Sequence, residues 1–198
     1  RLALTGLLGG LLLALLPTAL LWLLGVYRFE PTSDRLPDLL AQGLLWAFAT
    51  GFYEELLARG YPFQRLIVGL GPWSAQAILA LTWMMIHGHT PGLPWQARGL
   101  GLLQVGLASF LLGQAWLRTR SLALPMGIHA GWVLAQGVLL GFPVGESAPP
   151  SLLVPKAQPD APLMLTGGPG GLESSLPTVI LFGVVFLLLL LGQRTARP

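Results

Sequence analysis

The chain has no cysteine and few charged residues. Of its 198 residues, 10% are Asp, Glu, Lys or Arg and 54% are hydrophobic, and the mean hydropathy is +0.69. The lack of cysteine excludes disulfides, thiol catalysis and cysteine-ligated metals. The lack of charge excludes an ordinary soluble domain, because a surface that faces water carries more ionised side chains than this. We therefore expect a chain that lies largely within a lipid bilayer.

The basic residues form no patch that would bind nucleic acid. Although the sequence pI is about 10.0, they are scattered near the ends of apolar runs. With the N-terminus in the cytoplasm, the positive-inside rule is satisfied by a modest excess of arginine on that side. The cytoplasmic set is then Arg1, Arg65, Arg118, Arg120, Arg194 and Arg197, against Arg28, Arg35, Arg98 and Lys156 outside. We expect a multi-pass protein of the cell membrane with both termini in the cytoplasm.

The apolar runs are long enough to cross a bilayer, which takes roughly 20 apolar residues per helix. They predict an all-α polytopic membrane bundle of about six transmembrane helices, forming a single membrane-embedded domain over residues 1–198. The expected spans are 2–27, 39–70, 73–87, 98–117, 122–140 and 179–191. Residues 2–24 are too long and too uniformly apolar for the core of a signal peptide, so we expect the first span to be retained.

Two breaks in this pattern come from glycine and proline. "GLGP" at 69–72 is expected to end the second span and to separate it from the third. Residues 141–177 are rich in both residue types and include "GGPGG". This composition predicts an irregular, solvent-exposed loop outside the membrane.

Two adjacent glutamates and an arginine lie inside the second span, in "FYEELLARGY". Insertion of a charged side chain at the centre of a span costs about 2.5–3.5 kcal/mol, so such a residue suggests function. Glu55 and Arg59 are four residues apart and can pair on one helix face. Glu54 points about 100° away from Glu55 and is free to face another group. A carboxylate in apolar surroundings is suited to act as a general base, while the alternative is one buried ion network of all three side chains.

Two histidines lie on other spans. His87 ends "TWMMIH" and lies four residues after Trp83, so the two rings share a helix face. His129 is flanked by small residues in "GIHAGW", which permits close helix packing. Either histidine alone is better explained as a hydrogen-bonded residue of the bundle.

Together, one carboxylate and two histidines on three spans can meet only in the bundle interior. The chemistry favoured by this set is water activation by Glu54, assisted by His87, with His129 as a donor to a developing oxyanion. The alternative is a metal site, with zinc held by the same three residues. No HExxH motif is present, so we rank the metal-free reaction first and expect no cofactor.

These motifs resemble those of the CPBP intramembrane protease family, also described as metalloproteases or glutamic proteases. The family includes CAAX prenyl proteases and bacteriocin-processing proteins. "EELLARGY" resembles its EExxxR motif, "WMMIH" its FxxxH motif with Trp83 in place of Phe, and "GIHAGW" its HxxxN motif. The resemblance covers about residues 43–140, and the short loops look more like the bacterial branch.

The resemblance implies an endopeptidase that cleaves a membrane-associated peptide or protein. It implies that Glu54 activates water, that His87 assists, that His129 stabilises the oxyanion, and that Glu55 and Arg59 support them. The family's asparagine falls at Val133, which has no hydrogen-bond donor in its side chain, and the chain contains no asparagine. Gln136, seven residues after His129 and on nearly the same face, is the expected substitute.

Two other functions remain open from the sequence. The first is an inactive family member that acts as a scaffold or a self-protection protein, which Val133 favours. The second is a proton-coupled transporter, with Glu54, His87 and His129 as a relay. No repeated half or pair of broken spans supports the transporter.

Overall fold

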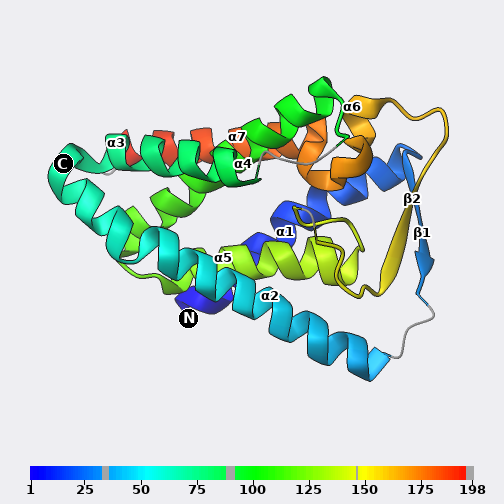
Figure 1. The fold of residues 1–198 in the computed structure, drawn as a ribbon, viewed down its shortest axis with the longest axis horizontal. Coiled ribbons are helices and arrows are strands. Elements are labelled where there is room, and N and C mark those ends of the chain that lie inside the picture. The colour runs from blue at the N-terminus through cyan, green and yellow to red at the C-terminus, as the bar shows by residue number, and fades with distance from the viewer. Residues whose placement is uncertain (33–35, 88–91, 146, 195–198) are drawn as a thin grey trace.

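The computed structural model describes residues 1–32, 36–87, 92–145 and 147–194, without the side chains of residues 38, 193 and 194. Within these ranges the chain is almost entirely helical (Figure 1). The longer helices are α1 (Leu2–Leu23), α2 (Leu36–Arg59), α3 (Tyr61–His87), α4 (Trp95–Thr119), α5 (Ala123–Val133) and α7 (Leu176–Arg194). The shorter elements are the π-helix η1 (Leu134–Leu139), α6 (Leu163–Thr166), the 3-10 helix η2 (Gly168–Ser174) and two strands, β1 (Tyr27–Pro31) and β2 (Leu153–Ala157).

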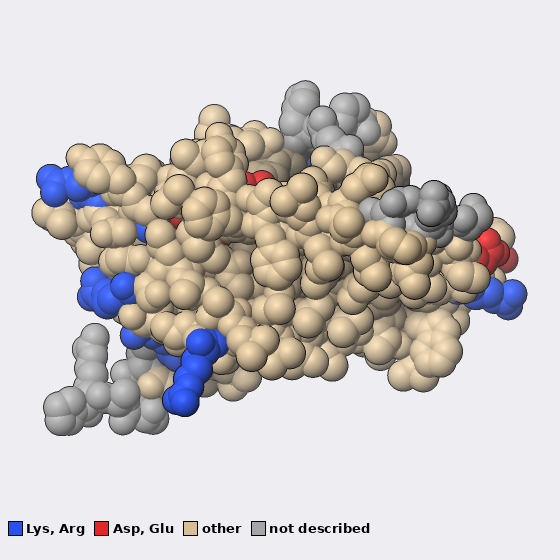
Figure 2. Space-filling model, turned by 90° about the horizontal axis from the view of Figure 1, so that it is seen from below, with Lys and Arg blue, Asp and Glu red and all other residues tan. Residues whose placement is uncertain are grey.

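The described helices have the length and composition of membrane spans. Four stretches are long and apolar enough to cross a bilayer: Leu2–Leu23, Leu39–His87, Trp95–Thr119 and Gly168–Gly192. A shorter apolar helix covers Ala123–Leu139. Figure 2 shows a broad face on which few charged atoms reach the surface, with basic side chains towards the ends of the molecule. The predicted all-α membrane bundle is confirmed.

The second and third spans follow the predicted break. α2 and the first part of α3 run in one direction through Gly60, whose N–H still bonds to the carbonyl of Leu56 at 3.1 Å (Figure 1). The chain reverses at Gly71, where φ is 81° and ψ is 166°. Because a residue with a side chain rarely adopts this conformation, Gly71 allows the turn, and Pro72 begins the returning helix. The return brings His87 back beside Glu54 of α2.

α1 and α5 are held together by paired glycines. A Cβ atom on Gly6 or Gly10 of α1 would lie within 2.4 Å or 2.0 Å of a backbone oxygen of α5. A Cβ atom on Gly127 or Gly131 of α5 would lie 2.2 Å from a backbone oxygen of α1. Both helices therefore present glycines four residues apart to each other, the spacing at which membrane helices pack most closely. This packing determines where α5 lies in the bundle.

α2 is held against α5 in the same way. A Cβ atom on Gly51 would lie 2.7 Å from the backbone nitrogen of Ala130. Gly51 is one helical turn before Glu54 and Glu55, and Ala130 follows His129 directly. The glycine thus brings the two glutamates within reach of the histidine.

Two sequence expectations are corrected. The first helix ends at Leu23 and not near Tyr27, because Gly25 adopts a positive φ of 71° and Tyr27 begins strand β1. Residues 141–177 are not an irregular exposed loop throughout: they contain β2, α6 and η2, and Leu172 is fully buried. The physical reason is that β1 pairs with β2 and that aromatic rings of β1 pack on Phe142, which folds the segment back over the bundle.

Candidate active site

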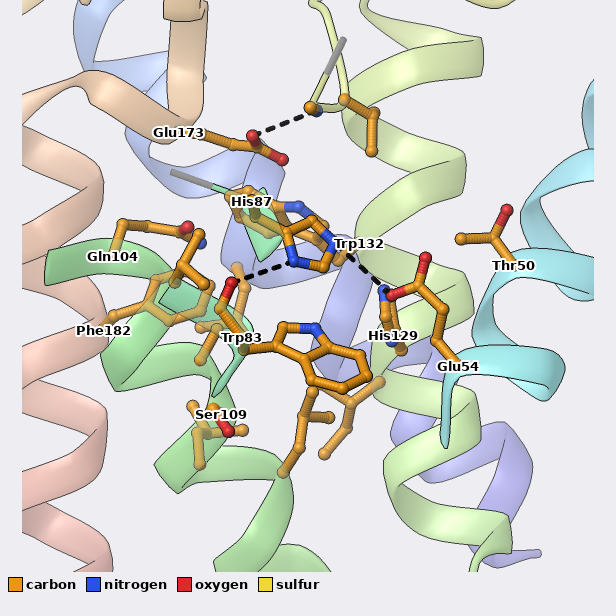
Figure 3. Close-up of a pocket in the computed structure, with 18 of the residues that line it drawn as sticks. Thr50, Glu54, Trp83, His87, Gln104, Ser109, His129, Trp132, Glu173 and Phe182 are labelled. Carbon is orange, nitrogen blue, oxygen red and sulfur yellow. Dashed lines mark hydrogen bonds and ion pairs between the residues drawn. The ribbon is translucent and has the colours of Figure 1, made fainter. Parts of the chain in front are cut away.

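A cavity of about 380 Å³ lies between the helices, and the three proposed catalytic residues face it (Figure 3). Its lining comes from α1, α2, α3, α4, α5, η2, α7 and the segment that follows η1. The polar and ionisable residues that line it are Thr50, Glu54, His87, Gln104, Ser109, His129, Ser147 and Glu173. The structure thus brings Glu54, His87 and His129 together from three helices.

Glu54 lies between the two histidines. Its Oε2 is 3.8 Å from Nε2 of His87 and 3.8 Å from Nε2 of His129. These distances exceed that of a direct hydrogen bond and suit groups that share a small bound molecule such as water. The Glu54 side chain is 26% exposed, so the carboxylate is accessible from the cavity. Three residues of one cavity therefore point their polar atoms at one position.

His87 is oriented by the helix turn that precedes it. Its Nδ1 lies 3.1 Å from the carbonyl oxygen of Trp83, and the Trp83 ring stacks on the imidazole with centroids 5.5 Å apart. A carbonyl oxygen only accepts hydrogen bonds, so Nδ1 carries a proton in this arrangement. In the neutral ring Nε2 is then the acceptor, and it faces Glu54.

His129 is oriented by a carboxylate. Its Nδ1 lies 3.0 Å from Oε1 of Glu55, and an ionised carboxylate only accepts, so Nδ1 donates. As with His87, Nε2 is left to face Glu54. The expectation that Glu54 and Glu55 take different directions agrees with this geometry: Glu54 faces the cavity, and Glu55 is fully buried behind His129.

Glu55 is neutralised by Arg59, as the spacing predicts. Nη1 of Arg59 lies 3.0 Å from Oε1 of Glu55, and both side chains are fully buried. Nη2 of Arg59 donates to the carbonyl oxygen of Ser109 at 3.0 Å and to its hydroxyl at 2.8 Å. The guanidinium also lies over the Trp83 ring, 5.4 Å from its centroid. Arg59 therefore links α2, α3 and α4 beneath the cavity, a role that its planar fork of donors allows.

Val133 and Gln136 do not line this cavity. Seen along α5, Trp132 lies about 60° to one side of His129 and Val133 about 40° to the other, and the cavity includes Trp132. Val133 instead belongs to the fully buried apolar core. Gln136 is displaced by the wider turn of η1, which a regular-helix projection does not anticipate. Its amide nitrogen donates to the carbonyl of Pro143 and, at 3.0 Å, to Oε1 of Glu173.

Sequence analysis missed Glu173 and Gln104 as residues of this cavity. Gln104 lies within the fourth span and is 3% exposed, and an uncharged amide in an apolar span is a weaker signal of function than an ionisable side chain. Glu173 follows "GGPGG" in a segment expected to be exposed. The one available signal was its position three residues before the last apolar helix, where a carboxylate could be carried into the bundle.

The cavity contains side chains of the types that bind zinc. Two imidazole Nε2 atoms and a carboxylate are donors that zinc accepts, and each histidine uses Nδ1 for another partner, as metal-bound histidines do. In the part of the chain that the structure describes, however, no group of three or more His, Cys, Asp or Glu side chains is arranged to hold a metal ion. His89, the third histidine, lies outside the described residues. Zinc held by Glu54, His87 and His129 therefore stays an alternative, which removal of metal by a chelator would test.

Comparison with known proteins identifies the motif-bearing half of the chain. No curated protein and no solved structure matches the chain. The family model of type II CAAX prenyl endopeptidase Rce1-like proteins matches residues 36–135. This region contains α2 to α5, and with them Glu54, His87 and His129. Together with the apolar spans, the match defines a multi-pass membrane protein of a protease family: the chain belongs to the Rce1-like family of type II CAAX prenyl endopeptidases.

Proposed function

We propose that the chain is an active intramembrane endopeptidase, in which Glu54 activates water to hydrolyse a peptide bond. The observation that carries this proposal is that Nε2 of His87 and Nε2 of His129 each lie 3.8 Å from the same oxygen of Glu54, at the wall of a cavity. A general base must be able to reach its proton directly or through one water molecule, and this arrangement meets that requirement.

In the first step, a water molecule donates one hydrogen bond to Glu54 and one to Nε2 of His87. Two acceptors orient the water so that its lone pair faces the carbonyl carbon of the substrate. Glu54 takes a proton as the water oxygen forms its bond to that carbon. Trp83 keeps His87 in the tautomer whose Nε2 accepts, because its carbonyl oxygen holds Nδ1–H.

His129 has the position of the oxyanion donor. In its imidazolium form it offers Nε2–H to the developing negative charge, while Glu55 accepts from Nδ1. The carbon–nitrogen bond then breaks, and the proton held by Glu54 passes to the leaving amine. Atoms balance: water supplies one oxygen and one proton to the new carboxyl group and one proton to the new amine.

The proposed substrate is a peptide or protein that reaches the cavity from the membrane. Lipid is the expected environment of the exposed apolar helices, and a cavity of about 380 Å³ has room for a few side chains rather than a folded domain. The bacterial branch of the family and a location in the cell membrane, with both termini in the cytoplasm, remain part of the same proposal.

A cleavage assay in isotopically labelled water tests the proposal. The purified protein in detergent is incubated with a library of apolar peptides, and products are read by mass spectrometry. We expect new C-termini that carry one ¹⁸O atom, and a loss of about 10³-fold or more in kcat for Glu54→Gln. Glu30→Gln, the same change at an exposed residue of β1, should keep full activity.

The inactive-scaffold alternative predicts a different result. The wild-type chain would then cleave none of the peptides, although it is folded and Glu54→Gln leaves its thermal stability intact. Val133 supports this alternative, because the apolar core in which it lies supplies no side-chain amide to the cavity. Cleavage by wild type that survives Glu54→Gln would contradict both readings and point to another nucleophile.

A further inference from the structure

Glu173 is a carboxylate of the cavity that the proposed mechanism does not use. It lies on η2, outside the family match, yet it lines the same cavity as Glu54 and His87. In the view of Figure 3, Glu173 and Glu54 lie on different sides of His87. Glu173 and His87 also line a second, small cavity next to Arg98. The carboxylate is thus placed where two pockets meet beside the reacting groups.

Glu173 is held in place by hydrogen bonds from Gln136, Gly145 and the Trp132 side chain. Its Oε1 accepts from the amide nitrogen of Gln136 at 3.0 Å, and its Oε2 accepts from the backbone N–H of Gly145 at 3.2 Å. All three donors are neutral, and the carboxylate keeps capacity to accept another hydrogen bond. Such fixed donors suit an ionised carboxylate, because they orient it without neutralising its charge.

Among the described residues, the His87 imidazole is the electrostatic partner of Glu173, and no lysine or arginine pairs with it. Glu55 is paired with Arg59, and Glu54 faces two histidines. No lysine or arginine lines the main cavity, and within the described ranges Glu173 forms no ion pair. The guanidinium of Arg98 is directed to the carbonyl oxygen of Leu93 instead, at 3.5 Å. With His87 neutral, as in the proposed first step, a carboxylate in these apolar surroundings has no cationic partner, and a cationic group of a ligand would supply one.

We propose that Glu173 is a specificity-determining residue that binds a cationic group of the substrate, a lysine or arginine side chain near the scissile bond. The walls around it include Trp132 and Phe182, which would pack on the aliphatic stem of such a side chain. This inference rests on the proposed function in so far as it calls the bound peptide a substrate. The binding preference itself does not require cleavage.

The other role open to Glu173 is that of a proton donor to the leaving amine. Glu54 already holds a proton at that stage, so the reaction does not need a second acid. A proton donor would also bind lysine-containing and neutral peptides alike. Charge preference in binding therefore separates the two roles.

A binding experiment in an uncleaving background tests the proposal. Fluorescent 12-residue apolar peptides carry one lysine, moved along the sequence, and each has a twin with norleucine at that position. Their affinities for Glu54→Gln protein are measured by fluorescence anisotropy in detergent. We expect lysine at one position to bind about 10-fold more tightly than norleucine. In Glu54→Gln/Glu173→Gln this ratio should fall to within twofold, and in Glu54→Gln/Glu30→Gln it should persist.

The proposal is overturned if no position favours lysine, or if the preference survives Glu173→Gln. Should the Glu173→Gln chain fail to fold, a third peptide with glutamate at the same position decides in the Glu54→Gln chain alone. The affinity order must then be lysine, norleucine, glutamate, and any other order rejects the inference. Selective binding without cleavage by wild type rejects only the protease, and cleavage without charge preference rejects only the role of Glu173.

Discussion

Oε1 of Glu55 lies 3.0 Å from Nδ1 of His129, and the same oxygen lies 3.0 Å from Nη1 of Arg59. The second glutamate of the motif is therefore shared between a structural cation and a histidine of the cavity. This arrangement explains why two adjacent glutamates occur in an apolar helix: Glu54 faces the cavity, and Glu55 orients His129.

We expect Glu55→Gln to lower kcat by about 10–100-fold, the usual effect of losing a residue that orients an active histidine. The glutamine amide has no negative charge, so its oxygen is a weaker acceptor for Nδ1–H of His129. Its NH₂ group could also take the position of that oxygen, where it could not accept the hydrogen bond. Activity on a cleaved peptide and the melting temperature of the same samples are the measurements. A variant with unchanged kcat would show that His129 does not depend on Glu55.

Arg59→Ala is expected to destabilise the fold by about 3–5 kcal/mol, because it leaves Glu55 charged and buried without its partner. The stability of Arg59→Lys should lie between that of wild type and that of Arg59→Ala. One ammonium group cannot reproduce the planar fork of donors that reaches both Glu55 and Ser109. Denaturation followed by circular dichroism measures the effect, with the exposed Arg65→Ala as control. An Arg59→Ala protein of wild-type stability but without activity would assign the arginine to chemistry instead.

Val133→Asn is expected to destabilise the chain by about 1–3 kcal/mol without raising the rate. The reason is that Val133 lies in the apolar core, where an amide would find no partner. Gln136→Leu should weaken the lysine preference described above more than the rate, since it removes a donor to Glu173. Melting temperatures and kcat for both variants check this, and faster cleavage by a stable Val133→Asn chain would place the oxyanion next to Val133.

Treatment with a chelator should leave both activity and melting temperature unchanged if Glu54 activates water directly. Incubation with EDTA or 1,10-phenanthroline, followed by dialysis and a peptide assay, measures this. Activity that disappears with the chelator and returns with zinc would establish the metal-dependent reaction.

We expect the folded chain to lose stability at high pH because of Tyr27. Its hydroxyl donates to the carbonyl oxygen of Thr166 at 2.6 Å, and burial raises the pKa of this phenol from 10.0 to about 12. Between these two values the unfolded chain loses the proton and the folded chain keeps it, so stability falls as pH rises from about 10 to 12. The melting temperature of wild type should therefore drop more steeply over this range than that of Tyr27→Phe.

The sequence predicted the fold and the directions of the Glu54, Glu55 and Arg59 side chains because both depend on local rules. Apolar run length gives the spans, "GLGP" gives the reversal, and helical spacing separates Glu54 from Glu55 and pairs Glu55 with Arg59. These features need no knowledge of the partner elements.

Features that depend on contacts between distant segments could not be predicted. The π-helical turn after Val133 moves Gln136 off the expected face, and no residue pattern marked it. Glu173 reaches the cavity only because β1 pairs with β2 and folds the proline- and glycine-rich segment inward. Gln136 bonds to Glu173, 37 residues further along the chain, and β1 pairs with a strand that begins only at Leu153.

The glycine contacts between α1 and α5 have a consequence for biosynthesis. α1 is translated and inserted first, whereas α5 leaves the ribosome only after α2, α3 and α4. Until then the glycine face of α1 has no protein partner, and α2 cannot dock through Gly51 onto a helix that does not yet exist. His129 is thus missing from the site until α5 is made, so the proposed proteolytic activity would arise only when the fifth helix enters the membrane.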